Sequence, residues 1–220
     1  MPPLEAFGPT IAIALILFVM LWFAFGTQRN IRKGNDLLRW LQGGLPLLGR
    51  RTTMRWLGSS AVELGIVEPA PPFREATVVV VLEPRDVSFL WAYARWRGRR
   101  DFLIVRLNLV AAPRFAIDVR DPHGWTARVG SHETDATDGD PWRALDGRGA
   151  ALVRGAPGAE QSAVREAWAR LGGVSDGVWK LTVQQVVPHL EIHVRPAAAV
   201  HGADELMAPI RELATKLAER

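Results

Sequence analysis

Two histidines and a carboxylate alternate near the C-terminal end of the chain, in the stretch PHLEIHV. If this stretch is a strand, His189, Glu191 and His193 project from one face and three aliphatic side chains project from the other. Imidazole and carboxylate groups are ligands for zinc and other transition metals. Same-face neighbours on a strand stand about 6–7 Å apart, so both imidazoles would have to lean over the carboxylate. Two interpretations stay open, a metal site and the simpler one of a solvated polar face.

Aromatic and basic residues interleave in a second stretch, WAYARWRGRR. The candidate binding residues in it are Tyr93, Trp96, Arg97, Arg99 and Arg100. Such a mixture is typical of surfaces on which single-stranded nucleic acid stacks. At the end of a helix, however, the same cations complement the helix dipole and the aromatic rings pack on protein. We expect structural packing first, contact with anionic lipid or an acidic partner next, and no role in nucleic-acid binding.

An acidic run from Glu133 to Asp140 could suggest calcium binding. In an EF-hand frame Gly139 would occupy position six, which places Thr134 and Ala136 where oxygen ligands are needed. The frame fails, and the run is typical of a solvated loop, with looser cation binding left open as the alternative.

No catalytic signature is present in the sequence. The chain has no cysteine, which excludes disulfide scaffolds, thiolate zinc sites and iron–sulfur clusters. It contains no nucleophile elbow, phosphate-binding P-loop, metalloprotease HExxH motif or dinucleotide fingerprint. We therefore assign no catalytic residue and predict no cofactor. A binding function is favoured over catalysis.

The elements that carry these residues begin with an apolar segment. No side chain from Ala6 to Gln28 is ionisable, and its centre, Thr10 to Phe25, reads TIAIALILFVMLWFAF. Its 23 residues make a helix of about 34 Å, enough to cross a hydrocarbon layer of about 30 Å. A cleaved signal peptide fits less well, because no basic residue precedes the apolar run and no small-x-small pattern follows it. Residues 1–28 are predicted to be a transmembrane anchor.

Charge predicts the orientation of this anchor. Glu5 is the only charged side chain before the span, whereas residues 29–55 carry seven basic side chains and one acidic one, a net charge of +6. Residues 61–220 carry 20 basic and 21 acidic side chains, a net charge of −1. Basic segments stay on the cytoplasmic side of a membrane. We expect the chain in the inner cell membrane, with the N-terminus outside and the rest cytoplasmic. A nucleic-acid binder would carry its positive charge on the folded domain.

The segment 29–73 is predicted to be a basic amphipathic juxtamembrane stretch followed by a proline-rich spacer. Leu37, Leu41 and Leu45 recur at helical spacing after a possible cap at Asn35. The predicted membrane-surface residues are Arg29, Arg32, Lys33, Arg39, Trp40, Arg50, Arg51, Arg55 and Trp56. The alternative is that the leucines pack on the soluble domain or on a neighbouring subunit.

The remainder, 74–220, is predicted to be a soluble α+β domain with a mostly antiparallel sheet and helices packed on one face. The expected strands cover 76–82, 101–110, 115–119, 125–129, 150–153, 179–183 and 190–194. The expected helices follow Asp86, surround Trp168 and close the chain, where Pro209 conflicts with a regular helix. Strands 101–110, 115–119 and 125–129 are expected to form a meander.

The leading hypothesis is a single-pass, membrane-anchored, non-enzymatic binding or scaffold protein, an accessory subunit of a membrane assembly. Its expected partners are the lipid bilayer and other membrane subunits or a second copy of the chain. One alternative is a membrane-tethered metal-dependent hydrolase that uses the two histidines and the glutamate. The other is a peripheral domain that senses anionic lipid through residues 29–57.

Overall fold

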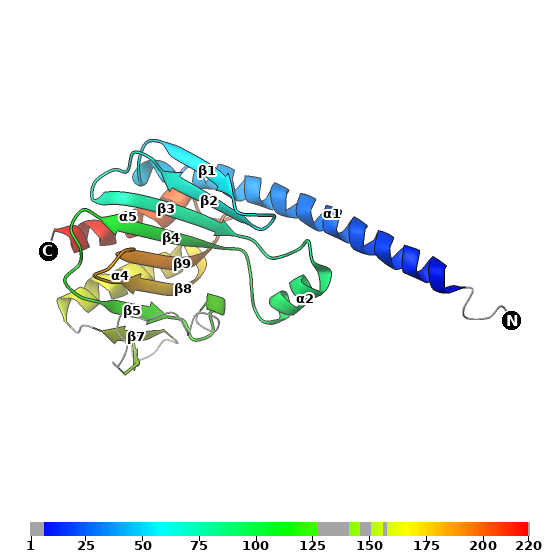
Figure 1. Cartoon of the computed structure of the whole chain (residues 1–220). Helices are drawn as coiled ribbons and strands as arrows, with labels where there is room; N and C mark the ends of the chain where they lie inside the picture. The colour runs from blue at the N-terminus through cyan, green and yellow to red at the C-terminus, as the bar shows by residue number, and fades with distance from the viewer. Residues whose placement is uncertain (1–6, 127–140, 146–150, 156–157, 220) are drawn as a thin grey trace.

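The computed structural model describes residues 7–126, 141–145, 151–155 and 158–219 of the 220-residue chain, and these form one antiparallel sheet with helices (Figure 1). The strands are β1 (Thr52–Trp56), β2 (Ala61–Ile66), β3 (Phe73–Val81), β4 (Phe102–Leu109), β5 (Ile117–Arg120), β6 (Arg143–Ala144), β7 (Leu152–Gly155), β8 (Ser175–Val183) and β9 (Leu190–Pro196). Their spatial order is β1-β2-β3-β4-β9-β8-β5-β7-β6. The expected α+β fold with an antiparallel sheet is confirmed.

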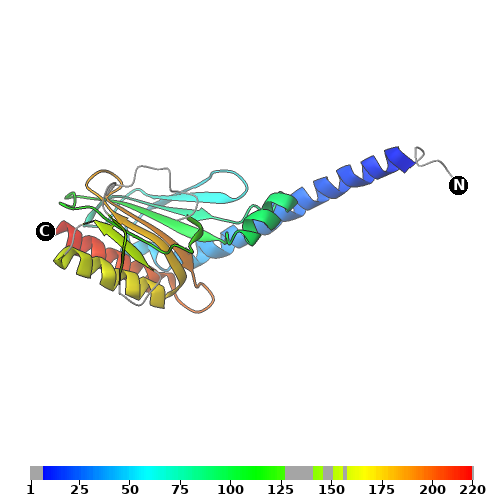
Figure 2. The same ribbon diagram turned by 90° about the horizontal axis from the view of Figure 1, so that it is seen from below.

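Helices α4 (Ala159–Gly173) and α5 (Ala203–Ala218) lie together under one face of the sheet (Figure 2). The hydrophobic core lies between them and the strands. In β4, Leu103, Val105 and Leu107 alternate inward and are fully buried against this layer. The predicted C-terminal helix is regular enough to include Pro209, which is buried inside α5. The expected placement of helices on one face is therefore observed for α4 and α5.

The first helix, α1 (Gly8–Leu41), is a single element of 34 residues that projects far beyond the sheet (Figure 1). Among the described residues, it is the helix that is long and apolar enough to cross a membrane. Only 6% of its most apolar 18-residue stretch is buried. A core helix of a soluble protein would be mostly buried. From Gly8 to Phe25 its large apolar side chains are exposed apart from Trp22, which is half-buried.

The second half of α1 belongs to the folded domain. Its buried residues Gly26, Asn30, Gly34, Leu37 and Leu41 recur every three or four positions and so form one stripe. The last two join the hydrophobic core, as do the leucines around the short 3-10 helix η2 (Leu45–Leu47). Of the two sequence interpretations of this stretch, the structure supports packing on the domain. The expected cap, Asn35, lies inside the continuous helix.

The sheet begins earlier than the expected domain boundary at residue 74. Strands β1 and β2 pair with each other, and β2 pairs with β3 over Ala61–Ile66. The expected spacer is the connection between β2 and β3. In it the Phe73 amide donates a hydrogen bond to the Ala70 carbonyl oxygen, and Phe73 is already the first residue of β3. The sequence signal was weak here because β1 is mostly exposed and shows no apolar alternation.

The expected meander is wrong in its pairing. Strand β4 lies between β3 and β9, and β5 lies between β8 and β7. Consecutive alternating segments do not specify neighbours, because strands far apart in the sequence bury their apolar faces equally well. Trp125 and Thr126 are helical, and the remainder of the expected strand 125–129 and the acidic run from Glu133 to Asp140 lie outside the described residues.

Candidate functional site

Helix α2 (Ser88–Trp96) lies beside α1 where α1 leaves the sheet (Figures 1 and 2). It follows β3 through a short connection, residues 82–87, and returns to β4 after Gly98, whose φ of +88° suits glycine. The rings of Trp22 in α1 and Trp91 in α2 are 6.3 Å apart. The two helices and the connection between β3 and α2 therefore form one structural unit at this end of the molecule.

One residue of that connection, Arg85, holds α1 at two points. Its carbonyl oxygen accepts a hydrogen bond of 3.1 Å from Trp22 Nε1, and its guanidinium donates one of 3.1 Å to Asn30 Oδ1. Trp22 and Asn30 are two turns apart on the helix. Gly26 lies between them, and a Cβ there would overlap the Arg85 carbonyl group. Glycine at this position lets the helix backbone approach the connection closely.

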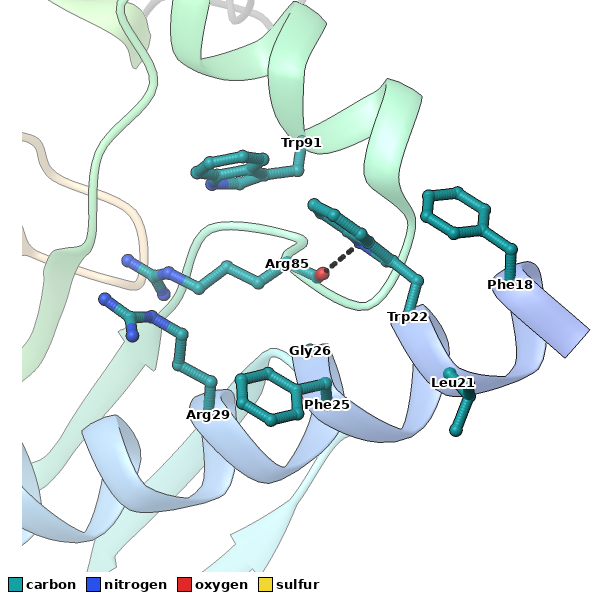
Figure 3. A pocket seen from close by; sticks show the side chains of 8 residues that line it. All are labelled: Phe18, Leu21, Trp22, Phe25, Gly26, Arg29, Arg85 and Trp91. Atoms are coloured by element: carbon teal, nitrogen blue, oxygen red, sulfur yellow. Dashed lines mark hydrogen bonds between the residues drawn. The ribbon is translucent and has the colours of Figure 1, made fainter.

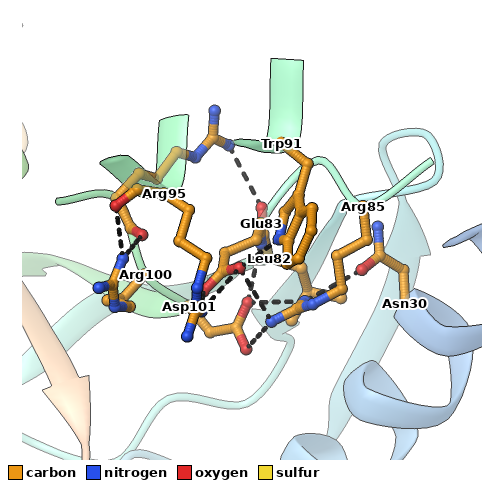
Figure 4. Close-up of polar contacts among 9 residues, drawn as sticks. Asn30, Leu82, Glu83, Arg85, Trp91, Arg95, Arg100 and Asp101 are labelled. Atoms are coloured by element: carbon orange, nitrogen blue, oxygen red, sulfur yellow. Dashed lines mark hydrogen bonds and ion pairs between the residues drawn. The ribbon is translucent and has the colours of Figure 1, made fainter. Parts of the chain in front are cut away.

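An ion-pair network fixes Arg85 and the base of α2 (Figure 4). Arg85 forms a bidentate pair with Asp101, with N–O distances of 3.0 and 2.9 Å. Glu83, 2% exposed, accepts hydrogen bonds from Trp91 Nε1 at 2.6 Å and from Arg95 at 3.3 Å. Removing one member of such a buried network leaves a charge without compensation, which is strongly destabilising. The network thus fixes the position of α2 relative to the sheet and to α1.

The gap between α1 and α2 is a cavity of about 380 Å³, here called the interhelical groove. Its lining is mostly aromatic and aliphatic (Figure 3): Phe18, Leu21, Trp22, Phe25, Gly26, Arg29, Arg85 and Trp91. Figure 3 shows the Arg29 and Arg85 side chains extending in the same direction, toward the domain end of the groove.

A second hollow of about 520 Å³ adjoins the groove and shares Phe25, Arg29 and Arg85 with it. We call it the basic end. Its other lining residues are Gln28, Arg32, Lys33, Asp36 and Asp101. Four cations and two carboxylates give this lining a net charge of +2. Within the described part of the chain, Arg29, Arg32 and Lys33 form no ion pair.

The outer side of α2 exposes large apolar side chains. Phe89, Tyr93 and Trp96 are 77%, 55% and 79% exposed, and the last two rings lie 6.2 Å apart. In the helix expected after Asp86, Leu90 and Ala94 lie on one apolar stripe, but Ala94 is buried and Leu90 is exposed. The stripe is incomplete because α2 lies beyond the end of the sheet and has no core to cover.

The candidate binding residues after α2 divide into two groups. Tyr93, Trp96 and Arg97 are exposed. Arg99 points inward and donates to the Leu82 carbonyl oxygen, and burial lowers its pKa although Glu83 and Asp101 oppose the effect. Arg100 donates to two main-chain carbonyl oxygens at the end of the helix. These two arginines hold the turn between α2 and β4.

The predicted membrane-surface residues do not lie on one surface. Arg29, Arg32 and Lys33 adjoin the groove, and Arg39 is exposed further along α1. Trp40 donates to the His201 carbonyl oxygen, and the ring of Trp56 contacts Gly34. The remaining arginines lie on or next to β1: Arg55 pairs with Glu63, Arg51 pairs with Glu68, and the Arg50 amide bonds to the Glu68 carbonyl oxygen. Both tryptophans thus contact protein, and a stripe that packs on protein has the same periodicity as one that lies on lipid.

The three predicted metal ligands are not brought together. His193 Nε2 is 3.0 Å from Glu191 Oε1, as expected for the same face of β9. His189 precedes β9 and is buried, and its Nδ1 accepts a hydrogen bond of 3.0 Å from the Leu109 amide. The described residues contain no group of three His, Cys, Asp or Glu side chains that could hold a metal ion. The strand alternation does not extend to His189, because it belongs to the turn in which Gln184 N bonds to its carbonyl oxygen.

Glu191 is instead the centre of a charged cluster on the sheet. Burial raises its pKa, but the hydrogen bond from His193, the charge of Lys180 and the hydrogen bond from Arg106 outweigh that effect and lower it below the ordinary value. Arg106 Nε and Lys180 Nζ lie 2.8 and 3.3 Å from its oxygens. A carboxylate with three basic neighbours stays ionised.

Sequence reasoning missed Asn30, Glu83, Arg85 and Asp101, which together hold the two helices. They are single polar residues in unrelated segments, so no spacing connects them. One signal was present: Asn30 is a polar residue on the same helical stripe as Gly26 and Gly34. A scan against protein-family models and a search of curated proteins found no match to this chain.

Proposed function

We propose that the chain is a single-pass membrane-anchored binding protein, an accessory or scaffold subunit of a membrane assembly. The observation that supports it is the continuity of α1, which passes without a break from an exposed apolar half into the core of the domain. A flexible linker would let a tethered domain take many positions and orientations relative to the membrane. A helix docked through Gly26, Asn30 and Gly34 would instead hold the domain at a fixed position and orientation relative to the bilayer.

The proposed location is the inner cell membrane, with the domain on the cytoplasmic side. Gly8 to Phe25 makes about 27 Å of helix, close to the thickness of a hydrocarbon layer. Arg29, Arg32 and Lys33 follow directly and are exposed, so they would lie among lipid headgroups. The half-buried rings of Trp22 and Trp91 would then lie at the boundary between acyl chains and headgroups, which tryptophan prefers.

The proposed contact surface for a partner is the outer side of α2 with Phe89, Tyr93 and Trp96. Exposed aromatic residues next to one another are enriched at protein interfaces. Because α2 lies beside the end of the apolar half of α1, a partner that covers it must itself reach the bilayer. The partner class is therefore another membrane protein or a second copy of the chain.

The test is solubilisation of the full chain from its native membrane in mild detergent, followed by size analysis and identification of proteins that co-purify. We expect a complex larger than one chain. Replacing Phe89 and Trp96 together by alanine should release the partner, whereas Thr53→Ala and Arg55→Ala on exposed β1 should not. Recovery of a lone wild-type monomer with no associated protein would contradict the proposal.

A further inference from the structure

The interhelical groove and its basic end together have two chemically different halves arranged along α1. The outer half is lined by Phe18, Leu21 and Phe25, and the inner half by Arg29 and Arg32. Phe18 and Lys33 are 15 positions apart, about 22 Å along the helix. A ligand that fills both halves must be apolar at one end and anionic at the other.

The charges of the inner half favour an anion. Arg85 is neutralised by its bidentate pair with Asp101, and Asp36 lies 3.8 Å from Arg39. Arg32 and Lys33 follow Arg29 by three and four positions, so all three lie on one side of α1. Arg29 extends next to the Arg85 side chain, so two guanidinium groups approach the same hollow (Figure 3). Because Asp101 already compensates the charge of Arg85, an anion in this hollow would be held by the charges of Arg29 and Arg32, which are unpaired within the described residues.

The position along α1 identifies the source of that anion. If the apolar half of α1 crosses the bilayer, as the proposed function holds, the outer half of the groove lies at the depth of acyl chains and the inner half lies at the depth of headgroup phosphates. We infer that the groove and its basic end bind one anionic glycerophospholipid, with an acyl chain along Phe18 and Leu21 and the phosphate between Arg29 and Arg32. This inference rests on the proposed membrane placement and is independent of any partner protein.

The experiment uses the full chain purified in mild detergent, with phosphatidylglycerol or phosphatidylcholine of identical acyl chains added. Native mass spectrometry counts the lipids that stay bound. We expect one phosphatidylglycerol per chain, and at least tenfold weaker retention of phosphatidylcholine. Replacing Arg29 and Arg32 together by glutamine should weaken phosphatidylglycerol retention by about tenfold or more, because cations near a headgroup each contribute to binding.

The matched control replaces Arg50 and Arg51 by glutamine, which removes the same charge from a place away from the groove and should leave retention unchanged. Fractionation of each variant shows whether it still enters the membrane, so lost lipid is distinguished from lost insertion. In a further sample, glycerol phosphate is added to the lipid-bound chain. The inference would be overturned by equal retention of the two lipids, or by equal loss of phosphatidylglycerol retention in the two double variants. Displacement of the lipid by glycerol phosphate alone would also overturn it. A chain that binds the lipid but co-purifies with no protein would refute only the proposed accessory role.

Discussion

At the residue scale, the arrangement depends on a few groups that link elements distant in the sequence. Arg85 contacts Trp22 and Asn30 in α1 and Asp101 at the start of β4. His189 similarly joins the turn before β9 to the end of β4 through the Leu109 amide. These residues determine where α1, α2 and the sheet lie relative to one another.

Gly26 is the position at which this docking is easiest to disturb. Gly26→Ala places a methyl group against the Arg85 carbonyl group, and we expect it to destabilise the docked helix by roughly 1–3 kcal/mol. Gly8→Ala is the control, because a Cβ there meets nothing within 4 Å. Thermal unfolding of both variants in the same detergent measures the effect. An equal or higher melting temperature for Gly26→Ala than for Gly8→Ala would show that the close approach is absent.

His189 makes the stability of the domain depend on pH. Burial lowers its pKa from the ordinary value of 6.5, and protonation of Nδ1 would place a donor against the Leu109 amide. The unfolded chain therefore binds this proton at higher pH than the folded chain, so the stabilisation is complete above about pH 6.5 and is lost as the pH falls. His189→Gln should remove this dependence. The difference in melting temperature between wild type and variant should shrink from pH 7.5 to pH 5.5, and a constant difference would contradict this assignment.

At the element scale, the sequence predicted the helices and strands whose apolar residues recur periodically. It missed the features that depend on contacts with other elements. The apolar half of α1, the core strands β3, β4, β8 and β9 and the helices α4 and α5 were expected, because burial on one face leaves a periodic pattern. Strand β1 was missed, since its side chains are mostly exposed. The pairing of β4 with β9 was missed because no local pattern encodes a contact between strands separated by 80 residues or more.

The candidate site shows the same limits. Its basic residues Arg29, Arg32 and Lys33 were selected by their position after the apolar segment. The groove itself was not predictable, because it depends on α2 lying beside α1 and on the Arg85 ion pair with Asp101. The three predicted metal ligands are not grouped for a related reason: alternation predicts a shared face, but His189 lies in a turn before the strand begins.

Truncation distinguishes the observed domain boundary from the one expected from the sequence. We expect residues 26–220 to unfold cooperatively in mild detergent, because they keep the buried stripe of α1 and the complete sheet. Residues 74–220 lack β1, β2 and the leucines that α1 and η2 contribute to the core, so they should aggregate. Circular dichroism melting and size-exclusion chromatography check both outcomes. A soluble, cooperatively folding 74–220 fragment would show that the first 73 residues are dispensable for the fold.

At the scale of the whole molecule, α1 is one continuous helix whose second half is built into the domain, and we propose that its first half crosses a membrane. The most direct test is a single-cysteine scan, since the chain has no cysteine of its own. Positions 8 to 41 are replaced one at a time in membranes, and reaction with a water-soluble maleimide is measured. We expect continuous protection from position 8 to 25, followed by protection at positions 30, 37 and 41, the buried positions of the second half where a side chain is already present. Labelling within 10–25, or uniform labelling of 26–41, would contradict the claim.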